Sequence, residues 1–259
     1  VIENPLVLDE ETHTYHMNLP QLEQLLVEHK PRIMILCNPH NPAGIQWDDA
    51  TLRQVATLCR EHGVMVISDE IHGDLMLGGR RHRPFATVSD DAAAISITLG
   101  APSKTFNIPG LVSSWMIIKN PDIRADFYKW LKANEFDTPT LFAMVATEAA
   151  YDRSEPWLDA MLEYVQGNVD AVERFCAEHL PQVRPMRPEA SFLVWLDCRG
   201  LGLTHNELVD RFISRAHVAL NTGTMFGSEG SGFMRLNVAC PRSCLMEALS
   251  RLPQALTSK

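Results

Sequence analysis

The stretch "RIMILCNPHNPAGIQWDDATLRQVATLCREHGVMVISDE", residues 32–70, decides the fold class. It opens with an apolar run at 32–37 and continues into an amphipathic helical pattern at 48–63, which has an acidic start and a glycine stop. A second apolar run follows at 64–70. Continuous, largely β-branched runs separated by helices are typical of parallel sheets, because such strands are buried on both faces.

The same pattern continues on the C-terminal side of this stretch. Apolar runs at 93–98 and 111–119 predict two more strands, so we expect an α/β unit with a mostly parallel sheet covered on both faces. The region from about 121 to 180 is mainly helical. Strand patterns at 190–197, 218–222 and 233–240 then alternate with helical patterns at 204–217 and from Arg242 onward. We therefore expect a large domain over residues 1–155 and a smaller α+β C-terminal domain over residues 156–259.

The composition excludes several classes of function. A formal net charge of −9 and the lack of any Lys/Arg run argue against nucleic-acid binding. No apolar stretch approaches the roughly 20 residues of a membrane span, and no secretion signal is visible. The six scattered cysteines form no CxxC pair, which predicts reduced thiols in the cytoplasm and no metal site.

Four expected strand ends carry side chains of chemical interest: Asn41, Asp69, Lys104 and Arg235. Ligands of α/β sheets bind outside the carboxyl ends of the strands. Each residue also has an ordinary explanation. Asn-Pro repeats mark turns, an Asp after a strand caps a helix, a lone Lys faces solvent, and a strand Arg pairs with an acid.

Together, these four side chains are what pyridoxal phosphate chemistry requires. A lysine forms a Schiff base and moves the Cα proton, for which its amine must be neutral. A carboxylate keeps the pyridine nitrogen protonated, and an amide can hydrogen-bond the phenolic oxygen. The arginine fork matches a substrate carboxylate.

Five motifs in order carry a family resemblance. The sequence resembles fold-type I pyridoxal-phosphate enzymes of the aminotransferase class I/II superfamily, and within them the MalY/PatB-like branch of cystathionine β-lyases (C–S lyases). The motifs are "CNPHNPAG" (37–44), "VISDEIHGDL" (66–75), "APSKTFNIPGL" (101–111), "EASFLVWLD" (189–197) and "GFMRLNVACPR" (232–242). The resemblance implies the aspartate aminotransferase fold and pyridoxal 5'-phosphate as cofactor.

The resemblance also implies a role for each candidate residue. Lys104 becomes the Schiff-base lysine and Asp69 the partner of the pyridine nitrogen. Asn41 becomes the contact to the phenolic oxygen, and Arg235 the clamp for the substrate carboxylate.

The resemblance also implies that two further residues contact the cofactor. His72 falls where many aminotransferases have a tyrosine near the phenolic oxygen, and its "DEIH" setting favours the lyase branch. Ser103, directly before Lys104, becomes a candidate phosphate contact.

The sequence departs from the family pattern in two places. Val112 stands where many aminotransferases have a phosphate-binding arginine, a feature the lyase branch also lacks. The family carries an N-terminal part, on the order of a hundred residues, that is missing here. Because that part supplies a phosphate loop and a stacking aromatic, we expect the isolated chain to be catalytically poor.

Three functions remain open. The first is a C–S β-lyase of amino-acid metabolism, which acts on cystathionine- or cysteine-type substrates and gives pyruvate, ammonia and a thiol. The second is an aminotransferase, which shares the proton abstraction. The third is a regulatory protein that reuses the fold, although that class carries a winged-helix segment absent here. In the enzymatic cases we expect a homodimer with a small amino-acid substrate.

Overall fold

The computed structural model describes residues 1–257 and contains a four-stranded central sheet of order β3-β4-β5-β6. Strands β3 (Ile33–Cys37), β4 (Met65–Asp69) and β5 (Ser96–Gly100) are parallel, whereas β6 (Trp115–Ile118) pairs antiparallel with β5. The prediction of a mostly parallel sheet is confirmed. In register, Cys37 lies opposite Asp69 and Asp69 opposite Leu99, so the parallel strands end at one edge.

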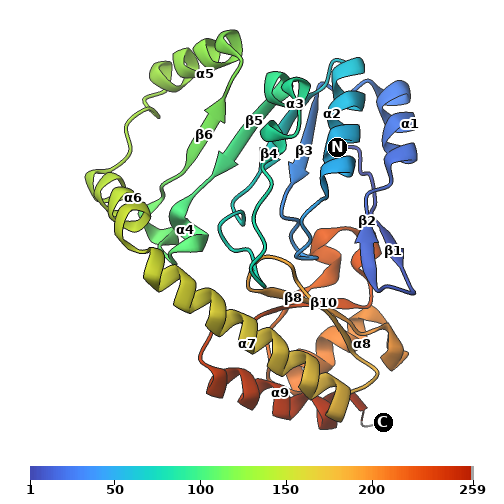
Figure 1. The fold of residues 1–259 in the computed structure, drawn as a ribbon. Helices are drawn as coiled ribbons and strands as arrows, with labels where there is room; N and C mark the ends of the chain where they lie inside the picture. Colours follow the sequence, from blue (N-terminus) through green and yellow to red (C-terminus); the bar gives the residue numbers. More distant parts are fainter. Residues whose placement is uncertain (258–259) are drawn as a thin grey trace.

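Helices cover one face of this sheet (Figure 1). Buried side chains of α1 (Leu19–His29), α2 (Asp49–Glu61) and α3 (Asp90–Ile95) share a core cluster with Leu36 and Val66 of the sheet. The alternate residues of β3 point the other way, and Ile35 there is 74% exposed. The expectation of a sheet covered on both faces is therefore wrong for the described residues. The strand order advances in one direction from β3 to β5, and right-handed crossovers then place α2 and α3 on the same side.

The predicted strands are shorter in the structure, including those at 190–197 and 233–240, which pair only over Leu193–Asp197 and Phe233–Asn237. Residues 93–95 belong to α3, because the Ser89 hydroxyl accepts from the Ala92 N–H and starts a helix through "DDAAA". Strand β6 begins only at Trp115. Only Asn221–Thr222 of the predicted strand 218–222 pairs, as β9.

The second sheet is antiparallel and has the order β7-β8-β10-β9. Its strands are β7 (Arg184–Met186), β8 (Leu193–Asp197), β9 and β10 (Phe233–Asn237). Helices α7 (Glu155–His179), α8 (His205–Asp210) and α9 (Arg242–Thr257) pack around it, with α7 running across its side (Figure 1). The predicted helical region 121–180 is confirmed as α5 (Pro121–Ala133), α6 (Leu141–Arg153) and α7. The domain division at 155/156 stays a prediction.

A short segment before β8 ties the two sheets together. The N–H groups of Glu189 and Ala190 donate to the Gly44 carbonyl at 2.8 and 3.0 Å, and the Ser191 N–H donates to the Leu75 carbonyl at 2.7 Å. Gly44 has φ +69°, and a Cβ there would stand 2.5 Å from the Pro188 Cβ. Glycine is needed at this crossing for both reasons. The contact brings the loops after β3 and β4 against the second sheet.

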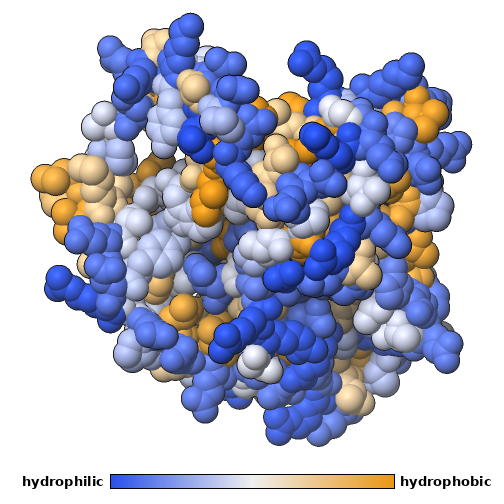
Figure 2. All heavy atoms as spheres, turned by 45° about the horizontal axis from the view of Figure 1, so that its top comes forward, coloured by the Kyte–Doolittle hydropathy of each residue, from blue (hydrophilic) through white to orange (hydrophobic). Residues whose placement is uncertain are grey.

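Within residues 1–257, none of the helices has both the length and the hydropathy that a bilayer span requires. Apolar side chains do reach the surface on α6, where Leu141, Phe142, Met144 and Val145 are exposed. Figure 2 shows apolar atoms gathered at the edge of the molecule where α6 lies.

Candidate active site

Asp69 is the last residue of β4 and lies at the carboxyl edge of the sheet. Its backbone carbonyl accepts from the Asn38 N–H at 3.0 Å, which continues the pairing with β3. Its side-chain Oδ1 accepts from the Ile71 N–H at 3.2 Å, a local bond that fixes the start of the turn. One carboxylate oxygen therefore stabilises the loop while the other remains for a ligand.

Asn41 and Arg235 meet from different sheets. Asn41 lies in the loop after β3, and its Oδ1 accepts from Arg235 Nη1 at 2.8 Å. Because the oxygen is taken, the amide nitrogen of Asn41 is the group left to donate to a ligand. Arg235, in the middle of β10, makes no ion pair with any acid of the described residues. Partial burial lowers the pKa of Arg235, yet the group stays cationic. An unneutralised, half-buried guanidinium is a receptor for an anion.

Lys104 lies on α4 (Pro102–Thr105), the single helical turn after β5. Pro102 occupies the first turn, where its missing N–H costs nothing. Thr105 is fully buried and donates to Asp74 Oδ2 at 3.0 Å, which joins α4 to the turn that carries His72. Lys104 itself is exposed at this edge.

His72 is 4% exposed, and its Nδ1 has no hydrogen-bond partner among the described residues. Burial lowers the pKa of His72 from 6.5 to about 4, with the cations of Lys104 and Arg235 adding to the effect. The ring is therefore neutral at pH 7 and lies close enough to both cations to sense their charge. A buried, unpartnered ring nitrogen at this edge fits a polar ligand group beside it.

A buried network that the sequence analysis missed lies beneath this turn. Glu70 accepts from the Ser68 hydroxyl at 2.8 Å and from the Phe85 N–H at 3.0 Å, and it contacts His82 Nε2 at 2.7 Å. His82 Nδ1 reaches Gln46 Oε1 at 2.9 Å. Sequence alone could have pointed only to Glu70, as an acid directly after a buried strand. The network clamps the loop at 82–85 against the end of β4.

The structure thus brings together five of the six predicted site residues: Asn41, Asp69, His72, Lys104 and Arg235. Ser103 shares the α4 turn with Lys104, and its carbonyl oxygen accepts from the Ile108 N–H at 3.1 Å. Its phosphate contact stays a prediction, as do the individual roles of the other five. Val112 lies in a turn with φ +51° and is 84% exposed.

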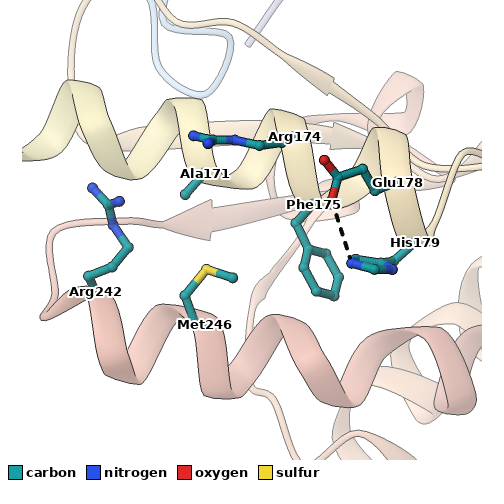
Figure 3. A pocket seen from close by; sticks show the side chains of 7 residues that line it. All are labelled: Ala171, Arg174, Phe175, Glu178, His179, Arg242 and Met246. Carbon is teal, nitrogen blue, oxygen red and sulfur yellow. Dashed lines mark ion pairs between the residues drawn. The ribbon is translucent and has the colours of Figure 1, made fainter.

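A separate hollow of about 270 Å³ lies between α7 and α9, away from this edge. Figure 3 shows Arg242 and Met246 of α9 facing Ala171 and Phe175 of α7, with Glu178 paired to His179. Arg242 is held there by Asn168. None of the predicted site residues lines this hollow.

A mixed sheet is followed by an antiparallel α+β unit; an acid, an amide and a lysine lie at or just after the ends of the parallel strands, and an arginine lies in the middle of β10. This arrangement defines the pyridoxal-phosphate-dependent transferase fold, that of aspartate aminotransferase. The chain belongs to the aminotransferase class I and II family, whose model matches residues 7–252.

Individual relatives show where in this family the chain lies. It is 44% identical to cystathionine β-lyase PatB of Bacillus subtilis over 99% of this chain and 66% of that protein. It is 36% identical to protein MalY of Escherichia coli over 97% of this chain and 64% of that protein. The chain thus spans slightly less than two thirds of the length of both relatives. The resemblance to the MalY/PatB-like branch is confirmed.

Solved structures of related proteins have the same fold as this chain. Cystalysin of Treponema denticola, which contains pyridoxal 5'-phosphate, superposes with a TM-score of 0.94 at 34% identity, over 98% of this chain and 64% of that one. The pyridoxal-phosphate-bound C–S lyase of Staphylococcus hominis gives 0.91 at 30% identity, over 100% of this chain and 66% of that one.

Proposed function

We propose that this chain carries the cofactor and substrate site of a pyridoxal-phosphate-dependent C–S β-lyase. Its substrates are cystathionine- or cysteine-type amino acids, and its products are pyruvate, ammonia and a thiol. The observation that carries the proposal is the convergence of Lys104, neutral His72 and the uncompensated Arg235 on the strand edge that ends in Asp69. The names of PatB and of the C–S lyase structure support the reaction class.

The residues present fit the cofactor. The free carboxylate oxygen of Asp69 would hold a proton at the pyridine nitrogen, and the Asn41 amide would donate to the phenolic oxygen. Ser103 would donate to the phosphate. The unpartnered Nδ1 of His72 would lie toward the same polar ring substituents. Bound pyridoxal phosphate supplies an electron sink for the pair released from the substrate Cα–H bond.

The chain's own groups perform the proton and binding steps. Arg235 binds the α-carboxylate and fixes the substrate's orientation, which places the Cα–H toward Lys104. The Lys104 amine would hold the cofactor in the resting enzyme. Once the substrate amine has displaced it, this amine would accept the Cα proton and pass it to the sulfur that leaves from Cβ, so that a neutral thiol departs. His72 is neutral and adds no third positive charge between two cations. Loss of the β-sulfur then follows from the chemistry of the substrate.

Assembly and location are part of this proposal. We place the protein in the cytoplasm, which its six free cysteines support. The exposed apolar side chains of α6 support a homodimer, because isolated monomers rarely expose such a cluster.

Incubation of the full-length protein with pyridoxal phosphate and L-cystathionine tests the reaction. The lyase produces pyruvate, ammonia and a free thiol in equal amounts over many turnovers. An aminotransferase, the alternative that the 29% identity to the arginine–pyruvate transaminase AruH of Pseudomonas aeruginosa favours, converts the cofactor to its amine form without releasing thiol. That second outcome would overturn the lyase proposal. Lys104→Ala is the inactive control.

A further inference from the structure

Arg235 is held by two neutral side chains from opposite directions. Its Nη1 donates to Asn41 Oδ1, and its Nη2 donates to Asn221 Oδ1, both at 2.8 Å. Asn221 is the residue that pairs with Arg235 in the β9–β10 register, so its side chain lies on the same face of the sheet. The Asn221 amide nitrogen contacts Met225 Sδ at 3.7 Å, which agrees with an oxygen directed at Arg235.

An aromatic ring covers the flat face of the same guanidinium. The Arg235 Cζ lies 4.7 Å from the centroid of the Phe226 ring, a cation–π contact. Phe226 is itself held edge-on by Trp195 at 5.6 Å, and Trp195 is 3% exposed on β8, opposite Arg235 in the register. The ring therefore restricts Arg235 to a single plane.

The loop that carries both Asn221 and Phe226 is closely packed. A Cβ on Gly223 would stand 2.0 Å from the Gly230 carbonyl oxygen, so the two ends of the loop touch through their backbones. The His205 ring joins its two sides: Nδ1 accepts from the Gly232 N–H at 3.1 Å, and Nε2 contacts the Thr222 hydroxyl. A loop fixed in this way can hold a side chain in a defined position.

Counting the N–H groups of the Arg235 guanidinium shows which of them remain available to a ligand. Each Nη of a guanidinium carries two hydrogens. Asn41 takes one on Nη1 and Asn221 takes one on Nη2, which leaves one hydrogen on each of two neighbouring nitrogens. Nε is buried without a partner among the described residues and is closed to solvent. The two free Nη hydrogens match the two oxygens of one carboxylate.

We propose that Asn221 is a positioning residue that makes Arg235 selective for a single α-carboxylate. The amide oxygen orients the guanidinium as an acid would, but without neutralising its charge, so the cation keeps its full attraction for the substrate. This inference rests on the proposed role of Arg235. The new element is Asn221, which orients the Arg235 guanidinium and leaves its positive charge uncompensated.

The test measures binding rather than turnover. The pyridoxal-phosphate-loaded protein is titrated calorimetrically with L-alanine, which has no β-substituent to lose, and with L-alaninamide, in which a neutral amide replaces the carboxylate. The ratio of the two dissociation constants reports carboxylate recognition alone. The variants are Asn221→Ala, the isosteric Asn221→Asp, Arg235→Lys and the loop control Ser228→Ala.

We expect Asn221→Ala to reduce the ratio about fivefold, the effect of one lost hydrogen bond, and Asn221→Asp to reduce it more, since the added acid neutralises Arg235. Ser228→Ala should keep both the wild-type ratio and the wild-type cofactor affinity. Added to Arg235→Lys, Asn221→Ala should have no further effect. An unchanged ratio in both Asn221 variants, with a reduced one in Arg235→Lys, would overturn this inference and leave the proposed function standing. An unchanged ratio in Arg235→Lys would overturn the proposed carboxylate role itself.

Discussion

Asn41 and Arg235, 194 positions apart in the sequence, share a hydrogen bond of 2.8 Å that joins the edge of the central sheet to the middle of β10. Asn41, expected to contact the cofactor, is thereby bonded directly to Arg235, expected to bind the substrate carboxylate. Movement of the second sheet against the central sheet would strain this bond. The relative position of the two sheets therefore sets the distance between cofactor and carboxylate.

Lys104→Ala should abolish covalent attachment of the cofactor, because no other amine of the described residues shares the α4 turn at the strand edge. Borohydride reduction after incubation with pyridoxal phosphate, followed by intact-mass measurement, should give a gain of one cofactor in the wild type and none in the variant. Lys119→Ala, which removes a surface lysine paired with Asp90, should gain the cofactor normally. Stoichiometric attachment to Lys104→Ala would refute the assignment.

The sequence located the three parallel strands because they are continuous apolar runs with chemically distinctive residues directly after them. It placed Asp69 and Lys104 at the correct edge. The expectation that Arg235 lies at a strand end was wrong, because β10 continues to Asn237 and Arg235 is its central residue. The sequence-based prediction failed at 93–95, where alanines continue a helix begun by Ser89. It also could not show Asn221, whose meaning depends on a two-residue strand and on a register set by distant parts of the chain.

His72 should make the stability of the protein depend on pH below neutrality. Its folded pKa of about 4 lies below the ordinary 6.5, so the unfolded chain takes up the proton first as the pH falls. The stabilisation from neutral His72 is complete above about pH 6.5 and is lost progressively toward pH 4. Between pH 7 and pH 5 this group should lower the free energy of unfolding by about 2 kcal/mol.

Denaturant unfolding at pH 7 and pH 5 measures that loss. The variant His72→Gln should lose about 2 kcal/mol less than the wild type over this interval, while His29→Gln, at an exposed histidine, should match the wild type. A remaining slope is expected from His40, whose pKa burial also lowers to about 4. An identical pH dependence in wild type and His72→Gln would show that His72 is not held neutral.

Glu70→Ala should lower the free energy of unfolding by about 3 kcal/mol, because it leaves the buried Phe85 N–H and the His82 ring without their acceptor. Glu70→Gln keeps one oxygen, which can still accept from the Phe85 N–H and the Ser68 hydroxyl, and should cost less. Urea titration at pH 7 measures both, with Glu61→Ala as an exposed control that should change little. Equal small losses in all three variants would mean that the network beneath Asp69 contributes no stability.

Gly44→Ala should be the more damaging of two matched glycine substitutions. Gly44 and Gly63 have nearly the same φ, +69° and +67°, so a side chain should strain both by about 1 kcal/mol. Nothing lies within 4 Å of a Cβ at Gly63, whereas one at Gly44 would meet the Pro188 Cβ at 2.5 Å. The crowding should add roughly 1–3 kcal/mol.

The two variants therefore separate backbone strain from the docking of the segment at 188–191. Because that segment holds the loops after β3 and β4 against the second sheet, Gly44→Ala should also weaken the L-alanine affinity of the cofactor-loaded protein, while Gly63→Ala should not. Thermal unfolding and calorimetric titration measure the two effects. Equal destabilisation by both substitutions, with the affinity unchanged, would show that this crossing does not position the site.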